Sequence, residues 1–120
     1  MVERREFSDG MKGKNLRYLK ELSGELPRLT RVGFLLLEHF SLPAFTQAFD
    51  AIVTANLLRP GLFFSKTFAL NEGEVFSDLG LVIRPDSNIK STDLLDLDLL
   101  FICGGYRTEL KANGEFIKLL

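Results

Sequence analysis

The segment Cys103-Gly104-Gly105 carries the residue types that most directly suggest chemistry in this sequence. A thiol becomes a nucleophile when it loses its proton, and glycine N–H groups can approach an anion closely because no Cβ atom intervenes. The segment follows the apolar run 99–102, as expected of a buried strand that ends in a turn with positive φ at its glycines. We therefore expect Gly104 and Gly105 to line a ligand site, with a tight turn into a following helix as the alternative.

Two further groups of polar residues stand at the ends of predicted strands. Tyr106 and Arg107 follow the glycines directly and are placed to close over a polar ligand, with a solvated Arg107 as the alternative. Glu38 and the single histidine, His39, follow the apolar run 32–37, at the strand end where α/β sheets collect ligands. The candidate ligand-binding residues are Glu38, His39, Ser41, Gly104, Gly105, Tyr106 and Arg107.

The same residue types argue against a metal site and against nucleophilic catalysis. His39 has no second residue at metal-ligand spacing, which favours a surface-loop role. Asp93, Asp96 and Asp98 lack the glycine and the distal glutamate of a calcium loop. Cys103 belongs to a leucine-rich strand, whereas a reactive thiol needs an electropositive, partly exposed setting. We expect no catalytic residue, no metal and no cofactor.

The candidate residues must be positioned by elements that the apolar pattern predicts. The continuous apolar run 32–37 is typical of a strand buried on both faces of a parallel sheet. Ser41 has the character of a helix cap, and Pro43 falls in the first turn of the helix. Apolar residues at helical spacing from Phe45 to Ile52 extend this helix to about Asn56.

The rest of the pattern predicts one long strand, two short ones and a last strand before the glycines. The aromatic-rich run 62–70 is a strand that ends in a hairpin-like turn at 71–74. The remaining segments are two short antiparallel strands at the sheet edge, 75–76 and 81–83, a loop at 86–90, one helical turn at 91–95 and a strand at 98–103. This succession predicts an α/β fold: a three-layer sandwich with a mainly parallel sheet and right-handed crossovers.

Composition limits the classes of protein that fit. The 120 residues suit one domain, and 46% hydrophobic and 26% charged residues are typical of a globular chain. A net charge of −1 gives no basic surface for nucleic acid. One cysteine allows no internal disulfide, and no apolar run approaches a membrane span, so we expect a cytoplasmic protein without membrane association. Residues 1–30 are predicted to be an N-terminal extension with one helical piece, and 31–120 a partial domain.

From Arg31 to Gly105 the order of these segments resembles the ThiJ/PfpI domain, which is related to the class I glutamine amidotransferases. The closer similarity is to the N-terminal domain of GlxA-type regulators of the AraC family. The segments that carry it are the strand 32–37, Phe40-Ser41-Leu42 leading into a helix that ends at Ala55-Asn56, the strand 64–70, the segment 80–86, and the strand 98–103 that ends in Gly104-Gly105.

This resemblance implies a flavodoxin-like sandwich without catalysis. In the enzymes of the superfamily the nucleophilic cysteine stands on a sharp elbow after a later strand, so Cys103, directly before the double glycine, is not its counterpart. The enzymes also place a glutamate early in the first helix, where a nearby carboxylate tunes the thiol. Ala44 stands at that position here. Both members of the catalytic pair are therefore missing from this sequence.

Two classes of function are consistent with the resemblance. The first is a non-catalytic effector-sensing and dimerisation domain of an AraC-family transcriptional regulator, with a small-molecule effector and with DNA bound through a helix-turn-helix part absent from this chain. The alternative is the N-terminal half of a ThiJ/PfpI-type enzyme, such as an amidase, a glyoxalase-like lyase or a deglycase, against which Ala44 counts. The pattern supplies one full-length helix for a parallel sheet, so we expect a truncated domain with exposed apolar surface that forms a homo-oligomer.

Overall fold

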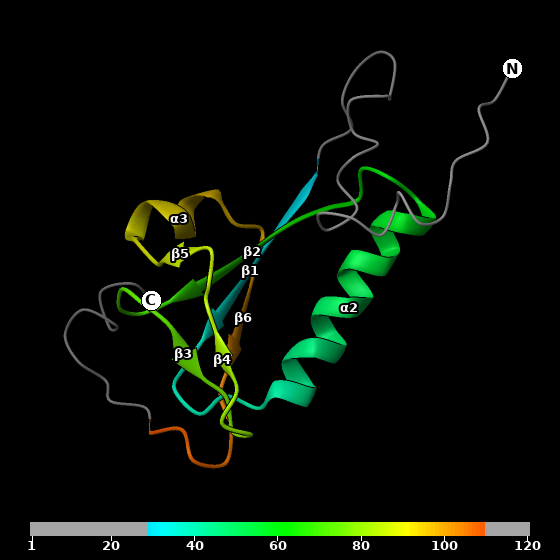
Figure 1. Ribbon diagram of the computed structural model, residues 1–120. Helices are drawn as coiled ribbons and strands as arrows, with labels where there is room; N and C mark the ends of the chain where they lie inside the picture. Colours follow the sequence, from blue (N-terminus) through cyan, green and yellow to red (C-terminus); the bar gives the residue numbers. More distant parts are fainter. Residues whose placement is uncertain (1–28, 110–120) are drawn as a thin grey trace, which may run out of the picture.

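The computed structural model describes residues 29–109 (Figure 1). In chain order its elements are β1 (Thr30–Leu36), α2 (Leu42–Leu58), β2 (Phe63–Ala69), β3 (Val75–Phe76), β4 (Val82–Ile83), β5 (Ser87–Asn88), α3 (Ser91–Asp96) and β6 (Leu99–Cys103). The helical piece expected within residues 1–30 lies outside the described residues. The domain boundary predicted after residue 30 therefore stays a prediction.

The main sheet has four strands in the order β5-β2-β1-β6, and every pair in it is parallel. β1 lies at the centre, with Phe34 opposite Thr67 of β2 on one side and Phe101 of β6 on the other. Side chains of β1 are buried in clusters on both faces of the sheet, which explains the unbroken apolar sequence of this strand. The α/β class and the mainly parallel sheet are thus confirmed, whereas the three-layer, flavodoxin-like arrangement stays a prediction.

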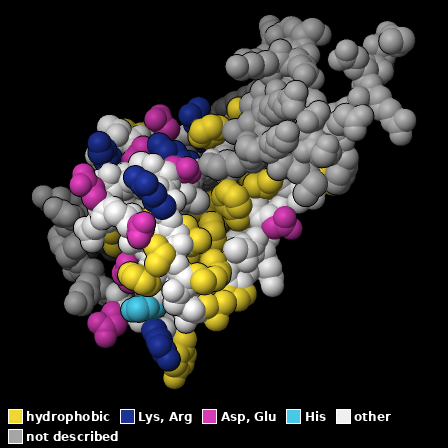
Figure 2. Space-filling model, viewed as in Figure 1, with side chains coloured by type: hydrophobic (Ala, Val, Ile, Leu, Met, Phe, Trp, Pro, Cys, Tyr) yellow, Lys and Arg dark blue, Asp and Glu magenta, His cyan; other side chains and the backbone are white. Residues whose placement is uncertain are grey.

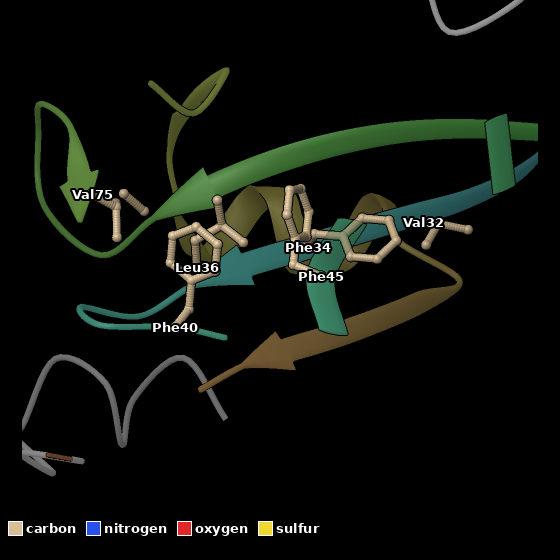
Figure 3. Close-up of a cluster of buried hydrophobic side chains, with 7 residues drawn as sticks. Val32, Phe34, Leu36, Phe40, Phe45 and Val75 are labelled. Atoms are coloured by element: carbon tan, nitrogen blue, oxygen red, sulfur yellow. The ribbon is translucent and has the colours of Figure 1, made fainter. Parts of the chain in front are cut away.

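Alternate residues of β1 point into two separate clusters of buried side chains. Val32, Phe34 and Leu36 belong to one cluster with Phe40 and Phe45, and Phe49 and Ile52 of α2 pack against it (Figure 3). The second cluster contains the buried side chains of Leu35, Leu37, Phe68 and Ile89, and α3 contributes Leu94 to it. In Figure 1, α2 and α3 accordingly lie on different sides of the sheet. We name these sides the α2 face and the α3 face.

Three polar residues in the segments of the resemblance join the elements together. The buried Asn56 amide donates to the carbonyl of Phe63 at 2.8 Å and accepts from its N–H at 2.9 Å, which connects the end of α2 to the start of β2. Asp86 accepts from the N–H of Thr67 at 2.9 Å, and Asp98 accepts from the N–H of Arg31 at 2.8 Å. Asp98 therefore fixes the start of β6 against β1.

The short strands depart from the expected arrangement. β3 and β4 do pair in antiparallel fashion, but as a separate two-stranded sheet that meets the β1–α2 connection at a bridge between Phe40 and Ser77. The turn at 71–74 leads from one sheet to the other, so the hairpin-like turn expected there was wrong. The expected loop 86–90 contains β5, which pairs with the end of β2. Two polar residues, Ser87 and Asn88, carry no hydrophobic pattern from which such a strand is predicted.

β6 forms one edge of the main sheet and exposes apolar side chains. Leu99, Phe101 and Ile102 are 50%, 41% and 44% exposed. Hydrophobic side chains gather beside α2 on the visible face of the molecule (Figure 2). This agrees with the expectation of exposed apolar surface. Within residues 29–109, no helix is long and apolar enough to cross a membrane.

Candidate functional site

The candidate site lies where the carboxyl ends of β1 and β6 meet. From β1 the chain crosses through α2 to β2 on one side, whereas β6 pairs on the other side of β1. The boundary between β1 and β6 is therefore a topological switch point, the place at which open α/β sheets bind ligands outside their carboxyl ends. All seven residues predicted from the sequence follow one of these two strands.

The two connections that leave β1 and β6 are hydrogen-bonded to each other. The N–H of Leu37 donates to the carbonyl of Cys103 at 3.0 Å, and the N–H of Ser41 donates to the carbonyl of Gly104 at 3.0 Å. Ser41 also caps α2, its Oγ accepting from the N–H of Ala44 at 3.4 Å. The expected helix start at Ser41 is confirmed, and the cap ties α2 to the glycine turn.

The two glycines occupy different environments. A Cβ atom on Gly105 would lie 2.5 Å from the carbonyl oxygen of His39 and 2.9 Å from the nitrogen of Ser41. A Cβ atom on Gly104 would meet no atom closer than 3.7 Å, where the side chain of Thr108 lies in ordinary contact. Neither glycine has a positive φ, so the expectation of a turn with positive φ at these two residues was wrong. Gly105 is required by the close approach of two backbone segments.

The residue in this site with a left-handed backbone is His39, whose φ is +62°. Such a conformation costs an L-residue about 1–2 kcal/mol. It is held by the N–H of His39, which donates to the carbonyl of Phe76 at 2.8 Å, and by the N–H of Asp78, which donates to the carbonyl of Phe40 at 2.8 Å. The β3–β4 hairpin thus supports the strained turn after β1.

Thr108, which the sequence prediction missed, joins the two connections through its side chain. Its Oγ1 donates to the carbonyl of Glu38 at 2.9 Å and accepts from the N–H of Gly105 at 2.8 Å. The N–H of Gly105 is therefore occupied within the protein. A hydroxyl three residues after the glycine is compatible with a turn closed by a side chain, but the contact with Glu38 spans 70 residues and leaves no sequence signal.

Two cavities that are lined by described residues open at this edge, one on each face of the sheet. The smaller, of about 190 Å³, lies on the α2 face and is lined by Phe34, Ser41, Ala44, Phe45, Ala48, Phe101, Ile102, Cys103 and Gly104. The larger, of about 530 Å³, is lined by Leu37, Glu38, His39, Leu70, Asn71, Arg107 and Glu109. Leu37 and Leu70 both belong to the apolar cluster of the α3 face, which assigns the larger cavity to that face. Charged side chains of both signs surround the histidine in Figure 2.

The predicted residues are thus divided between the two cavities. Glu38, His39 and Arg107 line the larger one, whereas Ser41 and Gly104 line the smaller one. Gly105 lies in the backbone junction between the two connections, and Tyr106 is fully exposed and lines neither cavity. Their ligand-binding role stays a prediction.

Cys103 and Ala44 line the smaller cavity together, but they form no reactive pair. Burial raises the pKa of the Cys103 thiol from 9.0 to about 11, so almost no thiolate exists at neutral pH. Its Sγ lies 3.9 Å from the carbonyl oxygen of Phe101. Alanine supplies no acid–base group. These observations agree with the interpretation of Cys103 as a wall residue.

Among the described residues, no group of three or more His, Cys, Asp or Glu side chains could hold a metal ion. Two of the three aspartates considered for calcium have structural partners. Asp93 accepts from the N–H of Lys90 at 2.8 Å at the start of α3, and Asp98 accepts from Arg31 on β1.

The comparisons with known proteins point to one class of protein. A crystal structure of an AraC family transcriptional regulator from Pseudomonas putida superposes on 68% of this chain with a TM-score of 0.65 and 49% sequence identity. The superposition covers 44% of that regulator. No known family profile matches the sequence.

Two curated relatives agree with this class. They are the HTH-type transcriptional regulator GbdR from two strains of Pseudomonas aeruginosa, each 29% identical over 90 residues. The matched part is 74% of this chain but 24% of GbdR, so the chain spans about a quarter of the relatives it matches. The similarity to AraC-type regulators expected from the sequence is confirmed. The finer assignment to the GlxA type and to the ThiJ/PfpI domain is not tested by these matches.

Proposed function

We propose that this chain is a non-catalytic, effector-sensing domain of a transcriptional regulator of the AraC family, with the ThiJ/PfpI-type fold of GlxA-like regulators. The observation that carries the proposal is the 49% identity to the Pseudomonas putida regulator across 68% of the chain. The regulator's DNA contact is assigned to a helix-turn-helix part outside this chain, because the net charge of −1 gives this domain no basic surface.

The effector is a small molecule bound at the carboxyl edge of the sheet. Support comes from two cavities at the switch point, which are lined by Glu38, His39, Ser41, Gly104 and Arg107. Catalysis is disfavoured because burial keeps the Cys103 thiol protonated and because Ala44 stands where the enzymes place a glutamate. The alternative is the N-terminal half of a ThiJ/PfpI-type enzyme, against which Ala44 counts.

We further propose that the domain is cytoplasmic and self-associates. The apolar side chains of Leu99, Phe101 and Ile102 on the edge strand support self-association, because an exposed apolar edge favours pairing with another chain. Light scattering of the purified chain tests this. A dimer or higher species is expected, and a sharp monomer peak with cooperative thermal unfolding would refute it.

Thermal unfolding with candidate effectors tests the sensing function. A ligand that binds the folded state alone raises Tm by mass action. At a hundredfold excess over Kd it adds about 2.7 kcal/mol to the free energy of unfolding. Amides, amino acids and quaternary amines form the panel, with each compound also incubated for turnover. The proposal expects a saturable Tm increase and an unchanged compound. Absence of any shift across the panel would reject the sensor, and turnover would favour the enzyme.

A further inference from the structure

The β3–β4 hairpin carries apolar side chains on both of its faces. Val75 and Ile83 oppose each other and pack into the apolar cluster of the α2 face, whereas the next pair, Phe76 and Val82, is 50% and 43% exposed. The connecting turn adds two exposed apolar side chains, Leu79 and Leu81. An antiparallel pair with one buried face ordinarily presents polar residues on the other face. The second apolar face therefore indicates a surface that a partner covers.

Hydrogen bonds fix this hairpin to the rest of the domain. The buried Oγ of Ser77 accepts from the N–H groups of Leu79 and Leu81 at 3.2 and 3.1 Å, which shapes the turn. Asp78 is the single charged residue between positions 75 and 83, and its carboxylate accepts from the N–H of Leu42 at 3.1 Å. The exposed apolar side chains are thus held in place before a partner binds, and a preorganised surface loses less entropy on association.

Two exposed residues of opposite charge flank the strands of the hairpin. Glu74 directly precedes β3, and Arg84 directly follows β4. The antiparallel register places these two positions opposite each other, and the alternation of side chains places both on the face of Phe76 and Val82. We name these four residues the hairpin face. It combines an apolar pair with one acid and one base at its border.

Two copies of the hairpin face are complementary to each other. A twofold axis parallel to the strands places β3 of one copy over β4 of the other. Phe76 then meets the partner's Val82, and Glu74 meets the partner's Arg84, with each contact made twice by symmetry. This arrangement covers apolar side chains with apolar side chains and brings no like charges together.

From this complementarity we propose that the hairpin face is the interface at which two copies of this chain form a homodimer, with the twofold axis parallel to β3 and β4. The inference rests on the proposed self-association and adds its surface and its geometry. The edge strand β6 is the competing surface, but positions 99–103 carry no charged residue that could set the register of a pair.

The size of the hairpin face predicts a weak dimer. Two copies bury on the order of 1,000 Å², which lies at the low end of specific interfaces. The dimer is therefore expected to depend on protein concentration. Sedimentation velocity of the 120-residue chain over a concentration series measures its dissociation constant.

Exchange of the two charges tests the geometry. Glu74→Arg and Arg84→Glu each place like charges opposite one another at two symmetric positions, so each is expected to weaken the homodimer about tenfold. An equimolar mixture of the two variants restores opposite charges at both positions and is expected to form a heterodimer about as tight as the original homodimer. An ion pair within one hairpin would not be restored by mixing, so absence of recovery in the mixture would overturn the proposed geometry.

Lysine substitutions test which apolar surface forms the interface. Val82→Lys puts an unpaired charge into the hairpin face and is expected to weaken the dimer at least about tenfold. Leu95→Lys removes an 86% exposed leucine of α3 and is the matched control, expected to leave the dimer unchanged. Leu99→Lys makes the same change on β6 and is also expected to keep the dimer. Circular dichroism melting of each variant establishes that it folds.

The outcomes separate this inference from the proposed function. A dimer that is lost in Leu99→Lys and kept in Val82→Lys would overturn the hairpin face, while self-association stands. A dimer that is unaffected by any of these substitutions would overturn the surface in the same way. An unsubstituted chain that stays monomeric at every concentration would reject both the inference and the proposed self-association.

Discussion

Gly105 and the carbonyl of His39 are so close that a Cβ atom on the glycine would lie 2.5 Å from that oxygen. The two residues are far apart in the sequence and come together because β1 and β6 are adjacent parallel strands whose connections cross at their carboxyl ends. The double glycine therefore permits a backbone junction between two connections. The two cavities of the candidate site lie on either side of this junction.

The first prediction concerns the two glycines. Gly105→Ala is expected to lower the free energy of unfolding by about 1–3 kcal/mol, because the new methyl group must displace backbone atoms rather than a flexible side chain. Gly104→Ala is the matched control and is expected to change it by less than about 0.5 kcal/mol, since its nearest neighbour lies 3.7 Å away. Urea denaturation of the three proteins measures the difference. Equal effects of the two substitutions would contradict the junction.

The left-handed conformation of His39 yields a second prediction. His39→Gly and His39→Ala both remove the imidazole, but glycine adopts a φ of +62° without the steric cost that alanine pays. The glycine variant is therefore expected to be more stable than the alanine variant by about 1 kcal/mol. Thermal melts compared at the same pH measure this. If alanine is as stable as glycine, the turn after β1 does not hold residue 39 in the left-handed region.

A third prediction concerns the buried amide of Asn56. Asn56→Leu leaves both the N–H and the carbonyl of Phe63 without their partners, so a loss of about 2 kcal/mol or more is expected. Thr54→Ala on the same helix removes an exposed hydrogen bond of 3.4 Å to Asp50 and is expected to cost less than about 0.5 kcal/mol. Chemical denaturation compares the two. A loss below 1 kcal/mol in Asn56→Leu would show that water replaces the amide.

The sequence was sufficient to predict the long elements because their residues carry a periodic signal. Burial of an element on one face or on two leaves a pattern in its sequence. This pattern is the apolar run in β1, the aromatic run in β2 and the helical spacing of apolar residues in α2. α2 ends at Leu58, two residues after the predicted Asn56. β5 was missed because two polar residues held by one neighbouring strand leave no periodic signal.

The sequence indicated which candidate residues share the carboxyl edge of the sheet, but it did not indicate their geometry. Strand ends in a parallel sheet share one edge, which was enough to select Glu38, His39 and Arg107 together. The division into two cavities depends on which face each side chain takes after the strand ends. The left-handed turn at His39 and the hydroxyl of Thr108 determine that division, and both depend on contacts between distant parts of the chain.

The fourth prediction tests Thr108 as a positioning residue. Thr108→Val keeps the shape of the side chain but removes both hydrogen bonds of its hydroxyl, and a loss of about 1 kcal/mol in stability is expected. Thr108→Ser retains the hydroxyl and is expected to keep most of the stability that Thr108→Val loses. Denaturation curves are measured on both variants. A valine variant as stable as the unsubstituted chain would contradict the role of the two hydrogen bonds.

The last prediction concerns the response of Cys103 to pH. Burial raises the pKa of its thiol to about 11 in the folded chain, above the ordinary value of 9.0. Between these values the folded state keeps a proton that the unfolded state releases. The contribution of the buried thiol to the free energy of unfolding is therefore fully present below pH 9 and is lost as the pH rises toward 11.

Because lysines and tyrosines also titrate in this window, the quantity to measure is the difference in stability between the unsubstituted chain and Cys103→Ser. That difference is expected to change in favour of the serine variant from pH 9 to pH 11. Since Cys103 is the single cysteine, its alkylation by iodoacetamide reports on the same thiol and is expected to be slow at pH 7.5 and to accelerate up to about pH 11. Fast alkylation at pH 7.5 in the folded chain would mean that the thiol is not held in the desolvated wall of the smaller cavity.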